Sequence, residues 1–266
     1  MPARSYLFVP GDRPERFAKA LASGADAVVV DLEDAVAPAA KDAARATVAA
    51  WLRTLPERSR VVVRINDAAS PCYDADLAML AAAGAAAVML PKAEEPELLE
   101  ALFARCRGIA VLPLVETARG MLSAQALAAC TGVQRLVFGT LDYALDLDLG
   151  SDPIALDAGH AQLALVSRAA NLDSPVAGVT TALDDEAQLL ADFARARAHG
   201  FGAKLCIHPR QVAPLHAALM PSPQELDWAR RVLLAAENAH GAVQVDGRMV
   251  DRPVIERARR IVERAG

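Results

Sequence analysis

Two acidic residues follow short apolar runs at equivalent places in the chain. Glu116 comes directly after the run 109–115, and Asp142 follows the run 135–138. If these runs are neighbouring parallel strands, which lie about 4.8 Å apart, the two carboxylates can approach each other. Two bare carboxylates would repel, and one would keep its proton. A divalent cation removes that conflict, and the pair therefore predicts a Mg²⁺ site.

The same positions have a structural alternative. Asp142, or Thr117 beside Glu116, could cap the helix that follows its strand, because a side-chain oxygen there accepts a hydrogen bond from a free helical amide. The spacing leaves both interpretations open. The histidines indicate no transition-metal site, since none of them has H-x-H or H-E-x-x-H spacing.

A single arginine ends another apolar run. Arg64 follows 61–63, and an arginine that points into a barrel mouth needs an anionic partner because burying its charge alone is costly. A carboxylate or enolate oxygen of a ligand would serve. The alternative is a structural salt bridge to Asp31, Glu33 or Asp34, which crowd after the second run. These acids could orient Arg64 or metal-bound water, or could form a solvated acidic loop.

The elements that must position these residues alternate along the chain. Eight apolar runs read as strands buried on both faces: 5–9, 27–32, 61–65, 86–90, 109–115, 135–138, 176–179 and 203–207. Helix candidates between and after them are 14–23, 39–55, 74–83, 96–105, 118–128, 153–170, 184–199 and 209–219. Eight β-then-α units predict an α/β fold, a (β/α)8 TIM barrel whose strand ends share one rim. An open doubly wound sheet would usually carry a G-x-G-x-x-G turn after its first strand, and none is present.

The C-terminal part has a different pattern. We expect a helix over 223–240, a hairpin over 242–250 around Asp246-Gly247, and a last helix over 252–264. The sequence therefore predicts a barrel domain over 1–220 and a helix–hairpin–helix appendage over 221–266. We expect the appendage to cover an active-site mouth, its own or a neighbour's, and to contribute to oligomer contacts.

The bulk composition limits the function classes. The hydrophobic fraction of 54% predicts a substantial core, and the net charge of −5 gives no reason to expect nucleic acid as a partner. The four cysteines form no C-x-x-C pair, which favours thiols in a reducing compartment. With neither a secretory signal nor an apolar stretch long enough for a bilayer, we expect a cytoplasmic protein with no membrane partner.

Seven segments, in order along almost the whole chain, resemble the citrate lyase β-subunit-like family. They are RSYLFVPGDRP (4–14), VDLEDAV (30–36), VRIN (63–66), LPK (90–92), PLVET (113–117), FGTLD (138–142) and GRMVDRP (247–253). The family includes citryl-CoA, malyl-CoA and citramalyl-CoA lyases and a malyl-CoA thioesterase. The resemblance implies the barrel fold and Mg²⁺ as the cofactor.

The resemblance also implies roles for single residues. Glu116 and Asp142 are similar to the family's metal ligands, and the resemblance implies that Glu116 also binds substrate. Arg64 resembles the arginine that contacts the substrate oxygens. Asp251 is similar to a catalytic acid that some members contribute across a subunit boundary, which implies a homo-oligomer, a trimer or a multiple of it. Its alternative is a cap for the last helix. Lys19 matches a position that contacts CoA in relatives; its alternative is a solvated helix lysine.

The activity implied is cleavage or formation of a C–C bond in a small 3-hydroxyacyl-CoA, giving an acyl-CoA and a 2-oxo acid. A thioesterase with the same metal site is one alternative, and a citrate lyase complex subunit that acts on a carrier-bound thioester is another. A non-enzymatic binding protein would show no metal-dependent turnover.

Overall fold

The computed structural model describes residues 2–237 and 243–265. Its contacts divide the chain into two compact units, Met1–Leu215 and His216–Gly266. The division falls inside one helix, α9 (Val212–Leu219). The domain boundary expected after residue 220 stays a prediction.

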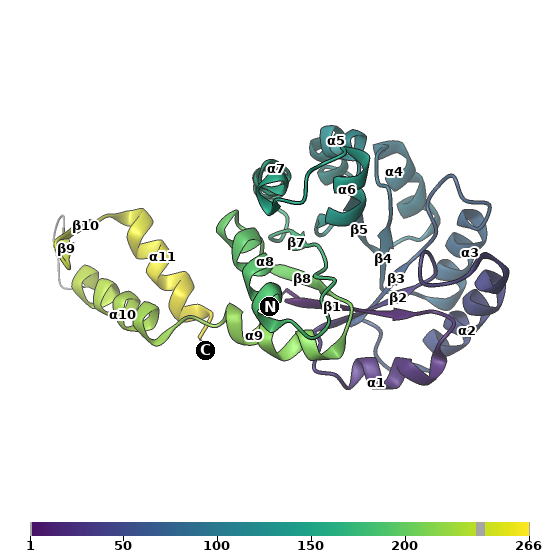
Figure 1. Cartoon of the computed structure of the whole chain (residues 1–266), viewed down its shortest axis with the longest axis horizontal. Coiled ribbons are helices and arrows are strands. Elements are labelled where there is room, and N and C mark those ends of the chain that lie inside the picture. Colours follow the sequence, from purple (N-terminus) through teal and green to yellow (C-terminus); the bar gives the residue numbers. More distant parts are fainter. Residues whose placement is uncertain (1, 238–242, 266) are drawn as a thin grey trace. The chain divides into compact units, whose positions relative to one another are not determined.

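The first unit is a closed barrel of eight parallel strands in the order of the sequence (Figure 1). The strands are β1 (Ser5–Pro10), β2 (Ala27–Asp31), β3 (Val61–Arg64), β4 (Ala87–Leu90), β5 (Ala110–Val115), β6 (Val137–Phe138), β7 (Val176–Ala177) and β8 (Ala203–Cys206). β8 closes the barrel by pairing with β1, where Leu205 lies opposite Tyr6. The predicted TIM barrel is confirmed.

Alternate residues of the strands fill the inside of the barrel. Val29, Met89, Leu112, Leu114 and Leu205 belong to one buried cluster there, each at most 3% exposed. The residues between them, such as those of β2, are buried as well. Both faces of the strands therefore exclude water, which is why the runs are apolar throughout rather than alternating.

The helices follow the strands and surround them (Figure 1). They are α1 (Phe17–Leu21), α2 (Lys41–Thr54), α3 (Tyr73–Ala83), α4 (Pro96–Arg105), α5 (Ala118–Ala128), α6 (Thr140–Asp146), α7 (Asp157–Ala169), α8 (Glu186–Ala198) and α9. Short 3₁₀ turns precede four of them: η1 (Pro14–Arg16), η2 (Pro38–Ala40), η3 (Pro153–Leu156) and η4 (Pro209–Gln211). No helix among the residues described is long and apolar enough to cross a membrane.

One helix, α6, was not anticipated. It begins two residues after β6, and its seven residues are too few for a periodic pattern. Tertiary packing stabilises it instead, because the buried Tyr143 ring lies edge-on to Phe138, with 5.1 Å between ring centroids. Asp142 lies in the first turn of this helix.

The second unit contains the predicted helix, hairpin and helix. α10 (Pro223–Glu237) and α11 (Arg252–Glu263) enclose a small core that includes Ala229, Val232 and Ile261. β9 (Val243–Val245) pairs antiparallel with β10 (Arg248–Val250). Asp246 and Gly247 both have positive φ, as a two-residue hairpin turn requires. The expected residues 238–240 of the helix and 242 of the hairpin lie outside the described residues.

Candidate active site

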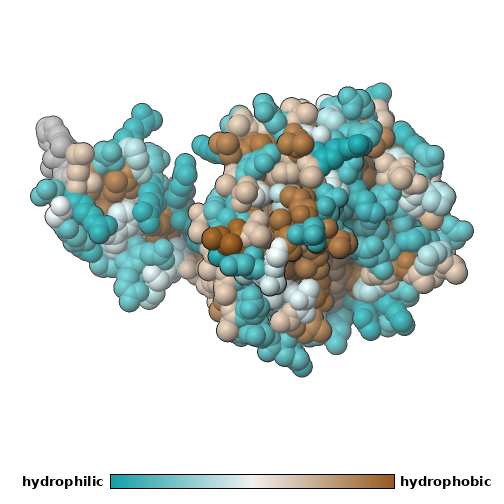
Figure 2. All heavy atoms as spheres, turned by 45° about the horizontal axis from the view of Figure 1, so that its top comes forward, coloured by the Kyte–Doolittle hydropathy of each residue, from teal (hydrophilic) through white to brown (hydrophobic). Residues whose placement is uncertain are grey.

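A cavity of about 780 Å³ lies at the carboxyl ends of the barrel strands. Its charged and polar lining consists of Arg16, Lys19, Asp31, Asp34, Arg64, Glu116, Thr140, Asp142 and His208. Its apolar lining includes Leu7, Phe8, Val9, Leu114, Leu141, Val179, Leu205 and Ile207. On the face of the barrel unit seen in Figure 2, apolar side chains gather in a hollow with hydrophilic surroundings.

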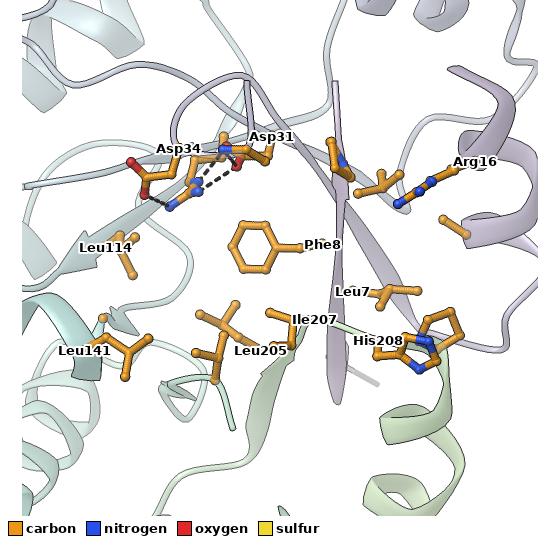
Figure 3. A pocket seen from close by; sticks show the side chains of 18 of the residues that line it. Leu7, Phe8, Arg16, Asp31, Asp34, Leu114, Leu141, Leu205, Ile207 and His208 are labelled. Carbon is orange, nitrogen blue, oxygen red and sulfur yellow. Dashed lines mark hydrogen bonds and ion pairs between the residues drawn. The ribbon is translucent and has the colours of Figure 1, made fainter. Parts of the chain in front are cut away.

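The apolar wall and the acidic wall of this cavity are separate. Figure 3 shows the Phe8 ring in the middle, with Asp31 and Asp34 on one side and Leu205 and Ile207 on the other. A ligand in the cavity would therefore meet the carboxylates of Asp31 and Asp34 on one side and the hydrocarbon of Leu205 and Ile207 on the other.

Glu116 is a buried carboxylate at the tip of β5. It is 3% exposed, and its Oε1 accepts a hydrogen bond from the backbone N–H of Lys92 at 2.8 Å. Its Oε2 lies against Gly139, where an added Cβ would come within 2.5 Å of that oxygen. The carboxylate is therefore held between the segments that follow β4 and β6, the two strands that pair with β5.

Asp142 is close enough to affect the ionisation of Glu116. The pKa of Glu116 is raised to about 7, mainly by burial and in part by the charges of Asp142 and Asp34, against the lowering effects of the Lys92 amide and Arg64. Asp142 itself is exposed and lines the cavity. The structure thus brings the two predicted acids together in one site.

Of the two residues that could cap the following helix, Thr117 does so and Asp142 does not. Thr117 is the N-cap of α5, and its hydroxyl oxygen accepts from the N–H of Gly120 at 3.0 Å. The N-cap of α6 is Gly139 rather than Asp142. Asp142 is therefore not used as a cap.

We predict that Gly139→Ala will disturb the site more than the fold. The new methyl group would overlap Glu116 Cβ and Oε2, both 2.5 Å away, so the carboxylate would have to turn. We expect weaker binding of divalent cations, seen as a smaller cation-induced rise in the unfolding temperature. Gly150→Ala, which meets no atom within 4 Å, is the matched control. An unchanged cation response in Gly139→Ala would contradict this account.

Arg64 is engaged by three acids. Its Nε and Nη2 donate to Asp31 Oδ1 and Oδ2 at 2.7 and 2.6 Å. Its Nη1 lies 2.9 Å from Glu33 Oε2 and 3.3 Å from Asp34 Oδ2. The guanidinium lies over the Phe8 ring, 4.9 Å from its centroid. The structural salt bridge is therefore formed, and the same arginine also lines the cavity.

Glu33 shows that this cluster holds a surplus of negative charge. Its pKa is raised to about 8, mainly by burial and in part by the charges of Asp34, Glu116 and Asp31, although Arg64 opposes them. Its Oε2 is buried and makes no hydrogen bond, because the nearby Arg64 Nη1 lacks the required geometry. One guanidinium does not neutralise the acids around it, and an additional cation fits the charge of the site.

The donor set also fits magnesium. Carboxylate oxygens are the donors that Mg²⁺ prefers, and proteins usually supply only one or two, with waters and substrate completing the shell. Within the described residues no group of three or more His, Cys, Asp or Glu side chains is placed to hold a metal ion. Glu116 and Asp142 offer two carboxylates of this kind in one cavity.

We predict that the cation-free protein will lose stability as pH rises. The pKa values of Glu33 and Glu116 are raised from 4.5 to about 8 and about 7, so both groups gain protons on folding. Their contribution is fully present below pH 4.5 and is lost as pH rises through 7 and 8. Thermal unfolding between pH 5 and 9 measures this. Glu33→Gln should flatten the dependence, and a wild-type unfolding temperature that rises across this window would contradict the prediction.

Lys19 and Asp251 lie in different units. Lys19, on α1, is exposed and lines the cavity with Arg16 and His208. Figure 3 places Arg16 and His208 away from Leu114 and Leu141, so this basic edge is separate from the wall near α6. Asp251 belongs to the second unit and is the N-cap of α11, accepting from Val254 N–H at 3.2 Å. Its predicted capping alternative is therefore observed.

Two other polar residues that follow strands have partners elsewhere. Asn66 donates from its backbone N–H and Nδ2 to the buried Asp76 on α3, at 2.9 and 2.6 Å. Thr180 donates to Asp192 at 2.6 Å. The sequence analysis missed the Phe8 and Leu205 wall and the packing of Gly139 on Glu116. The signal for the wall was available, because alternate residues of β1 and β8 must point into the barrel.

The closed barrel and the charged cavity at the carboxyl ends of its strands define a TIM-barrel protein with an acidic site. The chain belongs to the HpcH/HpaI aldolase/citrate lyase family, whose model matches residues 4–209. A second family model, described as a C–C bond lyase of the TIM-barrel fold, matches residues 163–266. The family resemblance seen in the seven segments is confirmed.

Individual relatives cover nearly the whole chain. A citrate lyase subunit beta-like protein of Mycobacterium tuberculosis is 40% identical over 269 residues, 98% of this chain and 95% of that protein. A (3S)-malyl-CoA thioesterase of Cereibacter sphaeroides is 37% identical, over 99% of this chain and 95% of its own length. The structure of CitE from M. tuberculosis in complex with magnesium, acetoacetate and coenzyme A matches with a TM-score of 0.89 at 36% identity, covering 99% and 98% of the two chains.

Proposed function

We propose that this protein is a Mg²⁺-dependent lyase that cleaves or forms a C–C bond in a small 3-hydroxyacyl-CoA such as citryl-, malyl- or citramalyl-CoA, giving an acyl-CoA and a 2-oxo acid. The observation that carries the proposal is the buried Glu116 carboxylate beside Asp142 in a cavity at the strand tips. The relatives support it, because CitE of M. tuberculosis was crystallised with magnesium, acetoacetate and coenzyme A.

Glu116 and Asp142 would hold the metal. When bound there, Mg²⁺ supplies Lewis acidity and a template for the substrate oxygens. The Lys92 amide and Gly139 fix the Glu116 carboxylate in advance, so little reorganisation is required.

Arg64 would stabilise the negative charge that develops on the thioester oxygen when the C–C bond breaks. Its two hydrogen bonds to Asp31 fix the guanidinium, and the Phe8 ring covers one of its faces. A preorganised donor of this kind contributes a few kcal/mol, about 10²–10³ in rate. Apolar residues such as Leu205 exclude water from the wall opposite the acids.

Two further roles belong to the proposal. Asp251 of a neighbouring copy would move the proton of the substrate hydroxyl, which requires a homo-oligomer, for which we propose a trimer. Lys19, whose ammonium has no partner among the described residues, would bind the CoA portion at the basic edge. We propose a cytoplasmic location.

A thioesterase is the second candidate, and the 37% identity to the malyl-CoA thioesterase favours it. Water would then attack the thioester in the same cavity. The third candidate is a citrate lyase complex subunit, which would act on a carrier-bound thioester in place of the CoA ester.

The test is an assay of the purified protein with malyl-, citramalyl- and citryl-CoA, with and without Mg²⁺, with products identified by mass. A lyase releases an acyl-CoA and a 2-oxo acid, whereas a thioesterase releases free CoA and the intact hydroxy acid. Turnover only of the carrier-bound thioester would indicate the complex subunit. Absence of Mg²⁺-dependent turnover with all of these substrates would refute the proposal.

A further inference from the structure

Lys92 has an unusual backbone conformation next to the site. It follows β4 by two residues, and its φ of 45° lies in the left-handed region. Residues other than glycine, asparagine and aspartate rarely adopt this conformation. Backbone strain of this kind persists where the surrounding structure enforces it, and it gathers at functional sites.

The conformation turns two successive amides toward β5. Lys92 N–H donates to Glu116 Oε1 at 2.8 Å, and Ala93 N–H donates to Leu114 O at 3.1 Å. An extended strand points successive N–H groups in opposite directions, so both bonds could not form on one side without such a turn. The left-handed conformation of Lys92 therefore lets one amide bind the Glu116 side chain and the next amide bind the backbone of β5.

The Lys92 amide also decides which oxygen of Glu116 remains for a ligand. Oε1 is taken by the amide, and Oε2 lies against Gly139, on the side of the segment that leads into α6 and Asp142. The amide thus acts from the β4 side and Gly139 from the β6 side, with Glu116 between them.

The side chain of Lys92 has a lesser part in this arrangement. Its Nζ lies 3.3 Å from Asp67 Oδ2, and the side chain is 52% exposed and does not line the cavity. Exposed ion pairs of this type contribute little. The ammonium interacts with the charges of Glu33 and Glu116, but the hydrogen bond that holds Glu116 comes from the backbone.

We propose that Lys92 is a positioning residue whose left-handed backbone, rather than its ammonium group, orients Glu116 for a divalent cation. This inference rests on the proposed function, because it assigns Glu116 as a metal ligand. It implies that residues able to adopt positive φ will support cation binding at this position and that β-branched residues will not.

The experiment compares Lys92→Val with Lys92→Gly by titrating Mg²⁺ into the substrate-free protein and following the unfolding temperature. For Lys92→Val we expect the half-saturating concentration to rise by about 10- to 100-fold, as for residues that orient metal ligands. Lys92→Gly keeps the amide and accepts positive φ, so we expect it to restore half-saturation to within about 2-fold of the wild type. If Lys92→Val does not fold, Lys92→Ala replaces it, and we expect the half-saturating Mg²⁺ concentration to rise in this variant too.

Asn171→Val is the matched control, because Asn171 also has positive φ, at 57°, and does not line the cavity. This substitution should lower the unfolding temperature without changing the half-saturating Mg²⁺ concentration. A wild-type response to Mg²⁺ that Lys92→Val leaves unchanged would overturn the proposal, as would a Lys92→Gly variant as weak as Lys92→Val, which would assign the effect to loss of the lysine side chain rather than to the backbone. A wild-type protein indifferent to Mg²⁺ would instead refute the metal site and, with it, this role.

Discussion

Glu116→Gln will reduce Mg²⁺-dependent turnover by about 10³-fold or more while the barrel stays folded. The glutamine keeps the shape and can still accept from Lys92 N–H, but it lacks the negative charge that the cation requires. Loss of one preorganised charge-stabilising donor costs about 10²–10³ in rate, and loss of a metal ligand removes the electrophile as well. Asp142→Asn should behave in the same way.

The fold of Glu116→Gln should be at least as stable as that of the wild type in the absence of metal. The pKa of Glu116 is raised to about 7, mainly by burial, so above that pH the folded wild type carries a poorly solvated charge. The glutamine side chain of the variant carries no charge. Steady-state kinetics and thermal unfolding at pH 8 measure both effects. Glu97→Gln, at an exposed position in the first turn of α4, controls for the loss of an acid elsewhere. Turnover near the wild-type rate in either site variant would contradict the assigned metal ligands.

Arg64→Met will destabilise the protein by about 3–5 kcal/mol, because it leaves the buried acids Asp31 and Glu33 without their cation. Turnover should also fall by about 10²–10³, since a guanidinium that lines the cavity is lost. Arg64→Lys keeps the charge but loses the two-pronged contact with Asp31, so we expect an intermediate loss of stability with most of the rate defect.

Denaturant unfolding and kinetics distinguish the two consequences of removing Arg64. Arg105→Met removes an exposed ion pair with Asp74 and should alter neither stability nor turnover appreciably. If Arg64→Met unfolds at the wild-type denaturant concentration, the acid cluster has another source of positive charge, and the interpretation of Glu33 would be wrong.

The sequence was sufficient to predict the barrel and to place Glu116 and Asp142 at one cavity on its rim. Strands buried on both faces are apolar along their whole length, and the carboxyl ends of parallel neighbours meet at one rim, so position alone brings the two acids together. Helices such as α4 and α5 were also located to the residue, because Pro96 and Thr117 mark their starts.

The remaining details depend on contacts between distant segments. α6 is stabilised by Tyr143 against Phe138 rather than by a repeating pattern. Sequence spacing could not decide whether Arg64 serves a ligand or its neighbouring acids, because that depends on distances of 2.6–3.3 Å. The positive φ of Lys92 could not be predicted, since lysine is not a residue type that marks a left-handed backbone.

The division of the cavity between two arcs of the barrel has an evolutionary consequence. The acids come from the ends of β2 and β5 and from α6, whereas much of the hydrocarbon wall comes from β1, from β8 and from the segment after β7, and these three strands are consecutive in the closed order. Selection can therefore reshape this wall, through Val179 or Leu205, without touching the acids or the Phe8 ring that packs on Arg64. Such a chain can change the ligand that it accepts by gradual steps, each of which leaves the acidic residues in place.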